Sequence, residues 1–315
     1  MTKQIAFLFP GQGSQSVGML DSFKANPSTA SLFSSAAQEA QQALGQDLAA
    51  LIEQGPAELL NLTTNTQPAM LMADVLVLRA WLAAGGSAPN LVAGHSLGEY
   101  AALVAAGVFS LSDGLGLVRI RAQAMQEAVP VGQGGMAAIL GLSDEQVKQA
   151  CEQASVNGEV AEAVNFNAPS QVVIAGSALG VKAACEAAKA LGAKRALELP
   201  VSAPFHSSLM KPASVKLAAA LANAKFENPA LPVYNNIDVA VESDPTRIRD
   251  ALVRQAYGPV RWVETIQAMT AAGTTLFVEC GPGKVLAGLV KRISDVPVVN
   301  IHDPDSIQAA LAVAQ

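Results

Sequence analysis

The stretch Leu91-Val92-Ala93-Gly94-His95-Ser96-Leu97-Gly98-Glu99-Tyr100 decides the fold that we expect for this chain. It begins as a short apolar strand, bends at a Gly-x-Ser-x-Gly sequence and continues into a helix that should reach about Gly107. A serine between a strand and a helix is typical of a nucleophile elbow, whose strained turn needs small flanking residues. A plain glycine-bounded turn is the alternative. The context favours an α/β fold with Ser96 as a nucleophile.

Strand-like and helix-like segments alternate on both sides of this stretch, which favours parallel strands buried on both faces. We therefore expect a large domain with an α/β-hydrolase-like core and a parallel sheet. Pro68 should lie in the first turn of its helix, and Ser112 or Asp113 should cap another. The segments expected in this domain are strands at 5–9, 91–93 and 275–279 and helices at 29–44, 68–84, 98–107, 112–128 and 284–293.

The segment 131–199 has a different pattern. Its expected elements follow the order strand, helix, strand, strand, helix, strand, at 136–142, 143–155, 159–166, 171–175, 178–191 and 195–199. This βαββαβ order is typical of a ferredoxin-like unit. We expect a small ferredoxin-like subdomain at 131–199, inserted into a large catalytic domain formed by 1–130 and 200–315.

The composition excludes several classes of protein. The 315 residues are 51% hydrophobic and carry a net charge of −6, which argues against disorder and against nucleic-acid binding. The longest apolar run, Tyr100–Phe109, is too short to cross a membrane, and Met1–Gln4 does not resemble a signal peptide. We therefore expect a cytoplasmic protein. The three cysteines are too widely spaced for a disulfide framework or a zinc site, so no metal is expected.

A nucleophilic serine needs a base, and the chain has only three histidines. His95 adjoins Ser96, and we expect its side chain to turn away from attack geometry. His206 lies in the loop Val201–Ser207, and His302 lies near the C-terminus, where the base of an α/β-hydrolase is expected. The residues alone leave His206 and His302 both open, with His206 slightly favoured.

Two further features fit a site that handles a charged acyl group. The backbone N–H of Leu97, at the start of a helix, is a natural donor to an oxyanion. Arg121 has Leu117 and Met125 one turn away on either side, so no local acid neutralises it. Its planar guanidinium could form a bidentate pair with a carboxylate. Arg119 also lacks a local acid, so this pattern alone does not single out Arg121.

Seven motifs in order resemble those of the malonyl-CoA:acyl carrier protein transacylases of type II fatty acid synthesis. The resemblance covers essentially the whole chain. The motifs are Phe9-Pro10-Gly11-Gln12-Gly13-Ser14-Gln15, Gly94-His95-Ser96-Leu97-Gly98-Glu99-Tyr100, Arg121 with Met125, Asn165-Phe166-Asn167-Ala168-Pro169, Pro204-Phe205-His206-Ser207, Gln255 before Gly258-Pro259-Val260-Arg261-Trp262, and Glu279-Cys280-Gly281-Pro282-Gly283-Lys284.

The resemblance implies a role for each matching residue. Ser96 would be the nucleophile and His206 the general base, oriented by the main-chain carbonyl of Gln255 in place of a carboxylate. Gln12 and Leu97 would supply the N–H groups of the oxyanion hole.

The acyl group would be recognised by three further residues. Arg121 would pair with the free carboxylate of the malonyl group, and Met125 would lie beside it in the substrate-binding site. Phe205 resembles the malonyl-selective form of its motif, because relatives that accept methylmalonyl carry a smaller residue there. A packing role for Phe205 is the alternative.

The resemblance implies an acyltransferase with ping-pong kinetics, which moves a malonyl group from malonyl-CoA to the phosphopantetheine thiol of acyl carrier protein. A coenzyme A thioester is the substrate, and no bound cofactor is expected. Lys284, Lys291 and Arg292 are candidates for a basic patch that docks the acidic acyl carrier protein. The rival interpretations are a hydrolase with His302 as its base and a catalytically silent module that binds acyl carrier protein.

Overall fold

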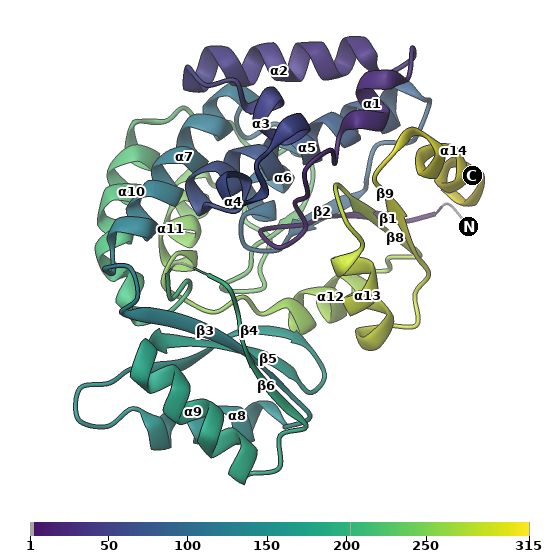
Figure 1. The fold of residues 1–315 in the computed structure, drawn as a ribbon. Helices are drawn as coiled ribbons and strands as arrows, with labels where there is room; N and C mark the ends of the chain where they lie inside the picture. The colour runs from purple at the N-terminus through teal and green to yellow at the C-terminus, as the bar shows by residue number, and fades with distance from the viewer. Residues whose placement is uncertain (1–2, 202, 315) are drawn as a thin grey trace.

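The structure, a computed structural model, describes residues 3–201 and 203–314 and combines two β-sheets with surrounding helices (Figure 1). Met1, Thr2 and Ser202, which belong to the expected start of the chain and to the expected histidine loop, lie outside the described residues. Among the residues described, none of the helices combines the length and the apolar character needed to cross a membrane. The cytoplasmic location stays a prediction.

The central sheet has five parallel strands in the order β7-β2-β1-β8-β9. Its middle strand β1 is buried on both faces because alternate side chains enter two different apolar clusters. Phe7 and Phe9 pack with one cluster, and Ala6 and Leu8 pack with the other. The strands are β1 (Ile5–Phe9), β2 (Leu91–Gly94), β7 (Val233–Tyr234), β8 (Leu276–Cys280) and β9 (Val298–Ile301).

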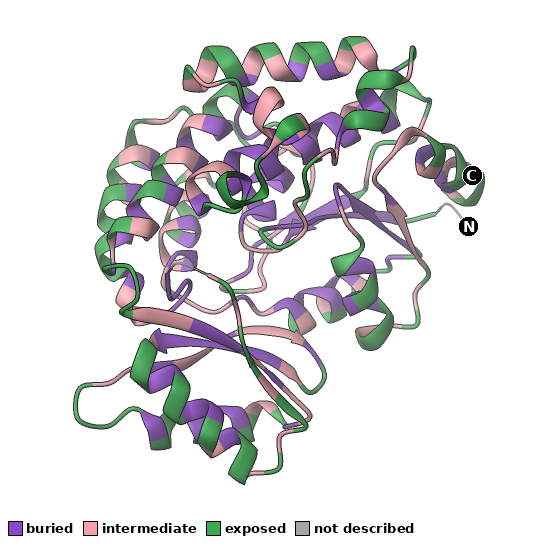
Figure 2. Ribbon diagram, viewed as in Figure 1, coloured by how far each residue is buried: buried purple, intermediate pink, exposed green. Residues whose placement is uncertain are grey.

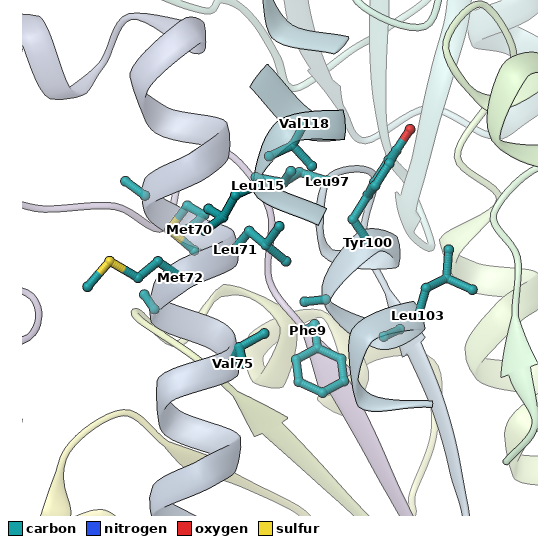
Figure 3. Close-up of a cluster of buried hydrophobic side chains, with 14 of the residues drawn as sticks. Phe9, Met70, Leu71, Met72, Val75, Leu97, Tyr100, Leu103, Leu115 and Val118 are labelled. Atoms are coloured by element: carbon teal, nitrogen blue, oxygen red, sulfur yellow. The ribbon is translucent and has the colours of Figure 1, made fainter. Parts of the chain in front are cut away.

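Helices cover both faces of this sheet (Figure 1). One face packs against α5 (Thr63–Ala83) and α6 (Gly98–Ala105), with α7 (Leu111–Glu127) packed on these two helices in the same cluster, and the other face packs against α12 (Trp262–Ala271) and α13 (Val285–Ile293). Figure 3 shows side chains of α5, α6 and α7 meeting Phe9 of β1 in one buried cluster. The outer helices are α1 (Asp21–Ala25), α2 (Ala30–Leu44), α3 (Leu48–Gln54), α4 (Ala57–Leu60), α10 (Lys211–Asn223), α11 (Pro245–Gln255) and α14 (Pro304–Ala314), and Ser208–Met210 form a short 3-10 helix.

The second sheet is antiparallel, with the strand order β4-β5-β3-β6. Two amphipathic helices cover one face and expose their outer sides (Figure 2). The other face contributes Met136, Val164 and Val173 to the core of the parallel sheet. The elements are β3 (Gly134–Leu140), α8 (Asp144–Ala154), β4 (Ala161–Ala168), β5 (Gln171–Ser177), α9 (Ala178–Ala190) and β6 (Arg195–Glu198).

The expected mixed α/β architecture with a parallel sheet is confirmed, and some local expectations were wrong. Helix α5 begins at Thr63, so Pro68 lies inside it and not in its first turn. Helix α7 is capped by Ser110, whose hydroxyl accepts from Asp113 N at 3.1 Å, and not by Ser112 or Asp113. The elements that were not predicted are the helices α1, α3, α4, α10, α11, α12 and α14 and the strands β7 and β9.

Candidate active site

Ser96 lies two residues after the end of β2 and has a left-handed backbone conformation, with φ of 52°. Such a conformation is strained for a serine and persists only where neighbouring groups hold it. Asn236, which is fully buried, does so: its Oδ1 accepts from Ser96 N at 2.7 Å, and its Nδ2 donates to Gly94 O at 2.8 Å. A Cβ on Gly94 would lie 1.9 Å from the backbone of Gly98, so the turn requires glycine there. These features match the expected elbow.

The hydroxyl of Ser96 lies 2.7 Å from His206 Nε2. His206 Nδ1 lies 2.8 Å from Gln255 O, and a carbonyl only accepts hydrogen bonds, so Nδ1 carries the proton. The unprotonated Nε2 therefore accepts from the Ser96 hydroxyl. His206 is buried and has a φ of 67°, a second left-handed residue at this site. The arrangement can move a proton from Ser96 to His206.

The other two histidines are placed differently. His95 lines the same cavity as Ser96, but its Nε2 lies 2.8 Å from Asn167 Oδ1 and its ring is edge-on to Trp262. His302 lies 3.4 Å from the carboxylate of Asp303 and does not line the cavity beside Ser96. Within the described residues, no cluster of three or more His, Cys, Asp or Glu side chains could hold a metal ion.

Arg121 projects from α7 into the same site and is only 2% exposed. Its Nη2 donates to Ser96 Oγ at 3.1 Å and to Gln255 Oε1 at 3.0 Å, and its Nη1 donates to Gln67 Oε1 at 2.7 Å. The guanidinium also lies 5.6 Å from the ring centre of Tyr100. Burial lowers the pKa of Arg121, but an arginine remains charged in proteins. A positive charge therefore stands beside the serine hydroxyl.

A cavity of about 120 Å³ opens beside Ser96, and all of the expected substrate-binding residues line it: Gln12, Leu97, Arg121, Met125 and Phe205. Gln12 follows β1 and Leu97 follows β2, so both lie at the carboxyl edge of the parallel sheet, where α/β folds bind ligands. Across residues 3–201 and 203–314, the backbone N–H groups of Gln12 and Leu97 donate to no protein acceptor. Both are available to a substrate oxygen.

Sequence reasoning missed the buried polar residues behind this cavity. Glu99 Oε2 accepts from Asn236 N and from Gln255 Nε2, each at 2.9 Å. Gln255 Nε2 also donates to Ser96 O at 3.0 Å. Burial raises the pKa of Glu99 to about 7, although the hydrogen bond from Gln255 opposes that shift. Glu99 and Gln255 stood inside the quoted motifs, but the sequence gives no sign that their side chains meet.

The expected docking residues do not line the cavity. Lys284 and Lys291 are exposed at the two ends of α13. Arg292 donates to Pro169 O at 2.6 Å and also to the side chain of Gln171, at the turn between β4 and β5. Arg292 therefore links α13 to the antiparallel sheet.

The pKa of His206 gives a prediction about stability. Burial and then the charge of Arg121 lower the pKa of His206 to about 3, so the unfolded chain binds more protons than the folded chain between that value and about 6.5. The contribution of neutral His206 is present above pH 6.5 and is lost as the pH falls, by up to about 1.4 kcal/mol per unit. Urea unfolding of His206→Gln should show a shallower loss of stability between pH 6 and pH 4.5 than the parent.

Glu99 changes the pH dependence of stability in the opposite direction. Because its pKa in the folded chain is about 7, the folded chain binds more protons than the unfolded chain as the pH falls. Glu99 is present in both His206→Gln and the parent, so its effect cancels when the pH dependence of stability of one protein is subtracted from that of the other. His302→Gln is the matched control, since it removes a histidine outside the cavity. Equal slopes in all three proteins would show that His206 is not held neutral by the fold.

The chain is similar to known proteins along almost its whole length. The family described as "Acyl transferase domain" matches residues 6–301. The malonyl CoA-acyl carrier protein transacylase of Salmonella typhimurium is 54% identical over 98% of this chain and 99% of its own length. The crystal structure of the acyl-carrier-protein S-malonyltransferase of Burkholderia pseudomallei is 60% identical, with a TM-score of 0.95 over 99% of this chain and 100% of that one.

A further solved structure holds a type II PKS acyl-carrier protein in complex with its malonyl-transacylase. The matched chain is 48% identical to this one, with a TM-score of 0.95 over 99% of this chain and 100% of that one. The order of the motifs, the elbow and the similarity along the whole length all agree. The chain belongs to the acyl transferase family and, within it, to the malonyl CoA-acyl carrier protein transacylases.

Proposed function

We propose that this enzyme transfers a malonyl group from malonyl-CoA to the phosphopantetheine thiol of acyl carrier protein, through a malonyl ester of Ser96. One observation carries the proposal: Ser96 Oγ lies 2.7 Å from a neutral base, His206 Nε2, and 3.1 Å from a buried cation, Arg121 Nη2. A nucleophile between a base and an anion receptor suits a short acyl group that ends in a carboxylate. The acceptor agrees with the related malonyl-transacylase solved in complex with an acyl-carrier protein.

In the first half-reaction, Ser96 Oγ attacks the thioester carbonyl while His206 Nε2 takes the hydroxyl proton. The Gln255 carbonyl, 2.8 Å from Nδ1, holds the imidazole in the required tautomer. The free N–H groups of Gln12 and Leu97 stabilise the oxyanion of the tetrahedral intermediate. Its collapse breaks the C–S bond, and His206 returns the proton to the departing thiolate of coenzyme A.

In the second half-reaction, the phosphopantetheine thiol of acyl carrier protein attacks the malonyl-serine ester. His206 accepts the thiol proton and returns it to Ser96 Oγ as the ester bond breaks. The same oxyanion hole serves both steps, and the two products leave in turn, which gives ping-pong kinetics. The proposed steps use these protein groups, the coenzyme A thioester and the phosphopantetheine thiol of acyl carrier protein.

Arg121 gives the site its preference for a carboxylate on the acyl group. The malonyl carboxylate is one methylene away from the reacting carbonyl, and the guanidinium lies within hydrogen-bond distance of Ser96 Oγ. Met125 and Phe205 form apolar walls of the same cavity. We propose that Phe205 leaves no space for an extra methyl group, a discrimination worth about 1–3 kcal/mol.

The acyl carrier protein is acidic, as is this chain, so docking must use a local basic surface. We retain Lys284 and Lys291 as candidates because both are exposed on α13. Arg292 is a weaker candidate, since its guanidinium already binds the turn between β4 and β5.

The finer description of the fold is also proposed. The central parallel sheet with a serine elbow supports an α/β-hydrolase-like core. The order β3-α8-β4-β5-α9-β6, with antiparallel pairing, supports a ferredoxin-like subdomain at 131–199, inserted between 1–130 and 200–315.

Intact-protein mass spectrometry tests the proposed reaction. Incubation with malonyl-CoA should give a malonyl adduct on Ser96, which acyl carrier protein discharges far faster than water does. An adduct lost equally fast without acyl carrier protein would favour a hydrolase. Absence of both an adduct and turnover would favour a module that only binds acyl carrier protein.

Arg121→Ala should lower kcat/KM for malonyl-CoA by about 10²- to 10³-fold, because the substrate carboxylate then enters a buried site without its charged partner. Transfer of the neutral acetyl group from acetyl-CoA should fall much less. Steady-state kinetics with the two thioesters measure the difference.

Arg119→Ala is the matched control, because Arg119 lies on the same helix but bonds to Gln46 outside the cavity. It should keep the parent's ratio of malonyl to acetyl transfer. Equal losses on both thioesters in Arg121→Ala would remove Arg121 from carboxylate recognition.

A further inference from the structure

All of the hydrogen-bond partners of the Arg121 guanidinium in the described part of the chain are neutral oxygen atoms. They are Oε1 of Gln67 at 2.7 Å, Oε1 of Gln255 at 3.0 Å and Oγ of Ser96 at 3.1 Å. Arg121 forms no ion pair among residues 3–201 and 203–314, although it is nearly fully buried. A buried charge is normally paired, because its removal from water is costly.

Three other arginines of this chain are paired with carboxylates. Arg79 is paired with Glu39, Arg254 with Asp238 at 2.6 Å, and Arg261 with Glu264. These three side chains are about one-third exposed, so each has both water and a carboxylate. Arg121 has neither. No carboxylate bonded to Arg121 therefore competes with an anion that enters the cavity.

The amide of Gln67 is fixed in the orientation that Arg121 needs. Gln67 Nε2 donates to Thr63 Oγ1 at 3.0 Å, and the Thr63 hydroxyl donates to Gln12 Oε1 at 2.9 Å. Because the nitrogen of the amide is committed to Thr63, its oxygen faces Arg121. Gln67 and Thr63 are both buried one turn apart on α5. The chain of hydrogen bonds leads from the Gln12 loop to the guanidinium.

The nearest acid is kept apart from Arg121 by a second amide. Gln255 accepts from Arg121 through Oε1 and donates to Glu99 Oε2 through Nε2, at 2.9 Å. An amide in this position satisfies both groups without letting them form an ion pair. The two glutamines thus hold the guanidinium without an ion pair, and Glu99 acts on its charge only across the amide of Gln255.

We propose that Gln67 is a residue that determines acyl-group specificity: as a neutral hydrogen-bond partner it leaves Arg121 without an ion pair and so preserves the charge that binds a carboxylate. This inference rests on the proposed function, because it concerns the same malonyl site. A carboxylate at position 67 would have the same shape and reach, but it would form an ion pair with Arg121 and compete with the substrate.

Gln67→Glu tests the charge. It should lower kcat/KM for malonyl-CoA by about 10²-fold, the usual scale for losing a charge-assisted hydrogen bond in a buried site. The value for acetyl-CoA should change by less than about 5-fold, since acetyl has no carboxylate. The ratio of the two values is the readout, because general damage to the fold would lower both.

Two controls isolate the charge from the shape. Gln46→Glu introduces a carboxylate beside Arg119, which lies on the same helix as Arg121 but outside the cavity. This variant should keep the parent's ratio of malonyl to acetyl transfer. Gln67→Met removes the amide without adding charge and should keep a malonyl preference within about 5-fold of the parent's. If Gln67→Glu does not fold, as judged by thermal melting, Gln67→Met decides alone: a retained preference supports the proposal.

An unchanged ratio in folded Gln67→Glu, or a collapsed preference in Gln67→Met, would overturn the proposal. Failure of the proposed function looks different, since the parent enzyme itself would then form no malonyl adduct. The two failures are therefore distinguishable in one set of assays.

Discussion

Replacing Ser96 by alanine should abolish the malonyl adduct and lower the kcat for malonyl transfer by about 10⁴-fold or more, the scale seen when a nucleophile is removed. The cavity, the oxyanion donors and Arg121 remain, so malonyl-CoA should still bind. The effect should therefore appear in kcat and not in the dissociation constant of malonyl-CoA. Intact-protein mass and pre-steady-state kinetics measure the adduct, and calorimetry with malonyl-CoA measures binding.

Ser214→Ala is the matched control. Ser214 is buried, but its hydroxyl donates to Lys211 O in α10 and it does not line the cavity. This variant should form the adduct at the parent's rate. A malonyl adduct that persists in Ser96→Ala would assign the nucleophile to another residue.

The elements that carry the nucleophile were predictable because their signals are local. Strand β1 was expected at 5–9 and forms there, since a strand buried on both faces appears as a continuous apolar run that ends at glycine or proline. Ser96 was found in the same way, because the Gly-x-Ser-x-Gly pattern is contiguous and Gly94 is required by the backbone of Gly98, only four residues away. A local requirement leaves a local pattern in the sequence.

Other elements gave weaker signals. Strand β7 has only two residues, so no apolar run marks it, and it forms because β2 offers it a partner. Helix α11 did have a start signal, Asp244 before Pro245, where the Asp244 carboxylate accepts from Thr246 N at 2.8 Å. This helix was not predicted because most of its residues are polar.

The catalytic partners of Ser96 could not be found from spacing. His206 lies 110 positions away from Ser96, and the residues alone left His302 open until the family resemblance favoured His206. Gln67 was missed altogether because a neutral amide on an apolar helix has no distinctive pattern. Its role depends on Arg121, Thr63 and Gln12 meeting in three dimensions.

Gly98→Ala should be a highly damaging small substitution in the elbow. A Cβ on Gly98 would lie 2.0 Å from Phe9 O and 2.8 Å from Pro10 O, both of which are backbone atoms. Relief would require α6 to move away from β1, which separates the Leu97 N–H from the Gln12 loop. We expect a loss of about 3 kcal/mol in the free energy of unfolding, at the upper end for overpacking, together with loss of malonyl transfer.

Gly116→Ala separates this steric effect from the general effect of replacing glycine in a helix. Gly116 lies inside α7, and a Cβ there would meet nothing within 4 Å. Alanine should therefore stabilise that helix by about 0.5–1 kcal/mol. Urea unfolding should move in opposite directions for the two variants. If urea unfolding showed the same change in stability for both variants, the elbow would be able to accept a methyl group. Close contact between α6 and β1 would then not explain why glycine occupies position 98.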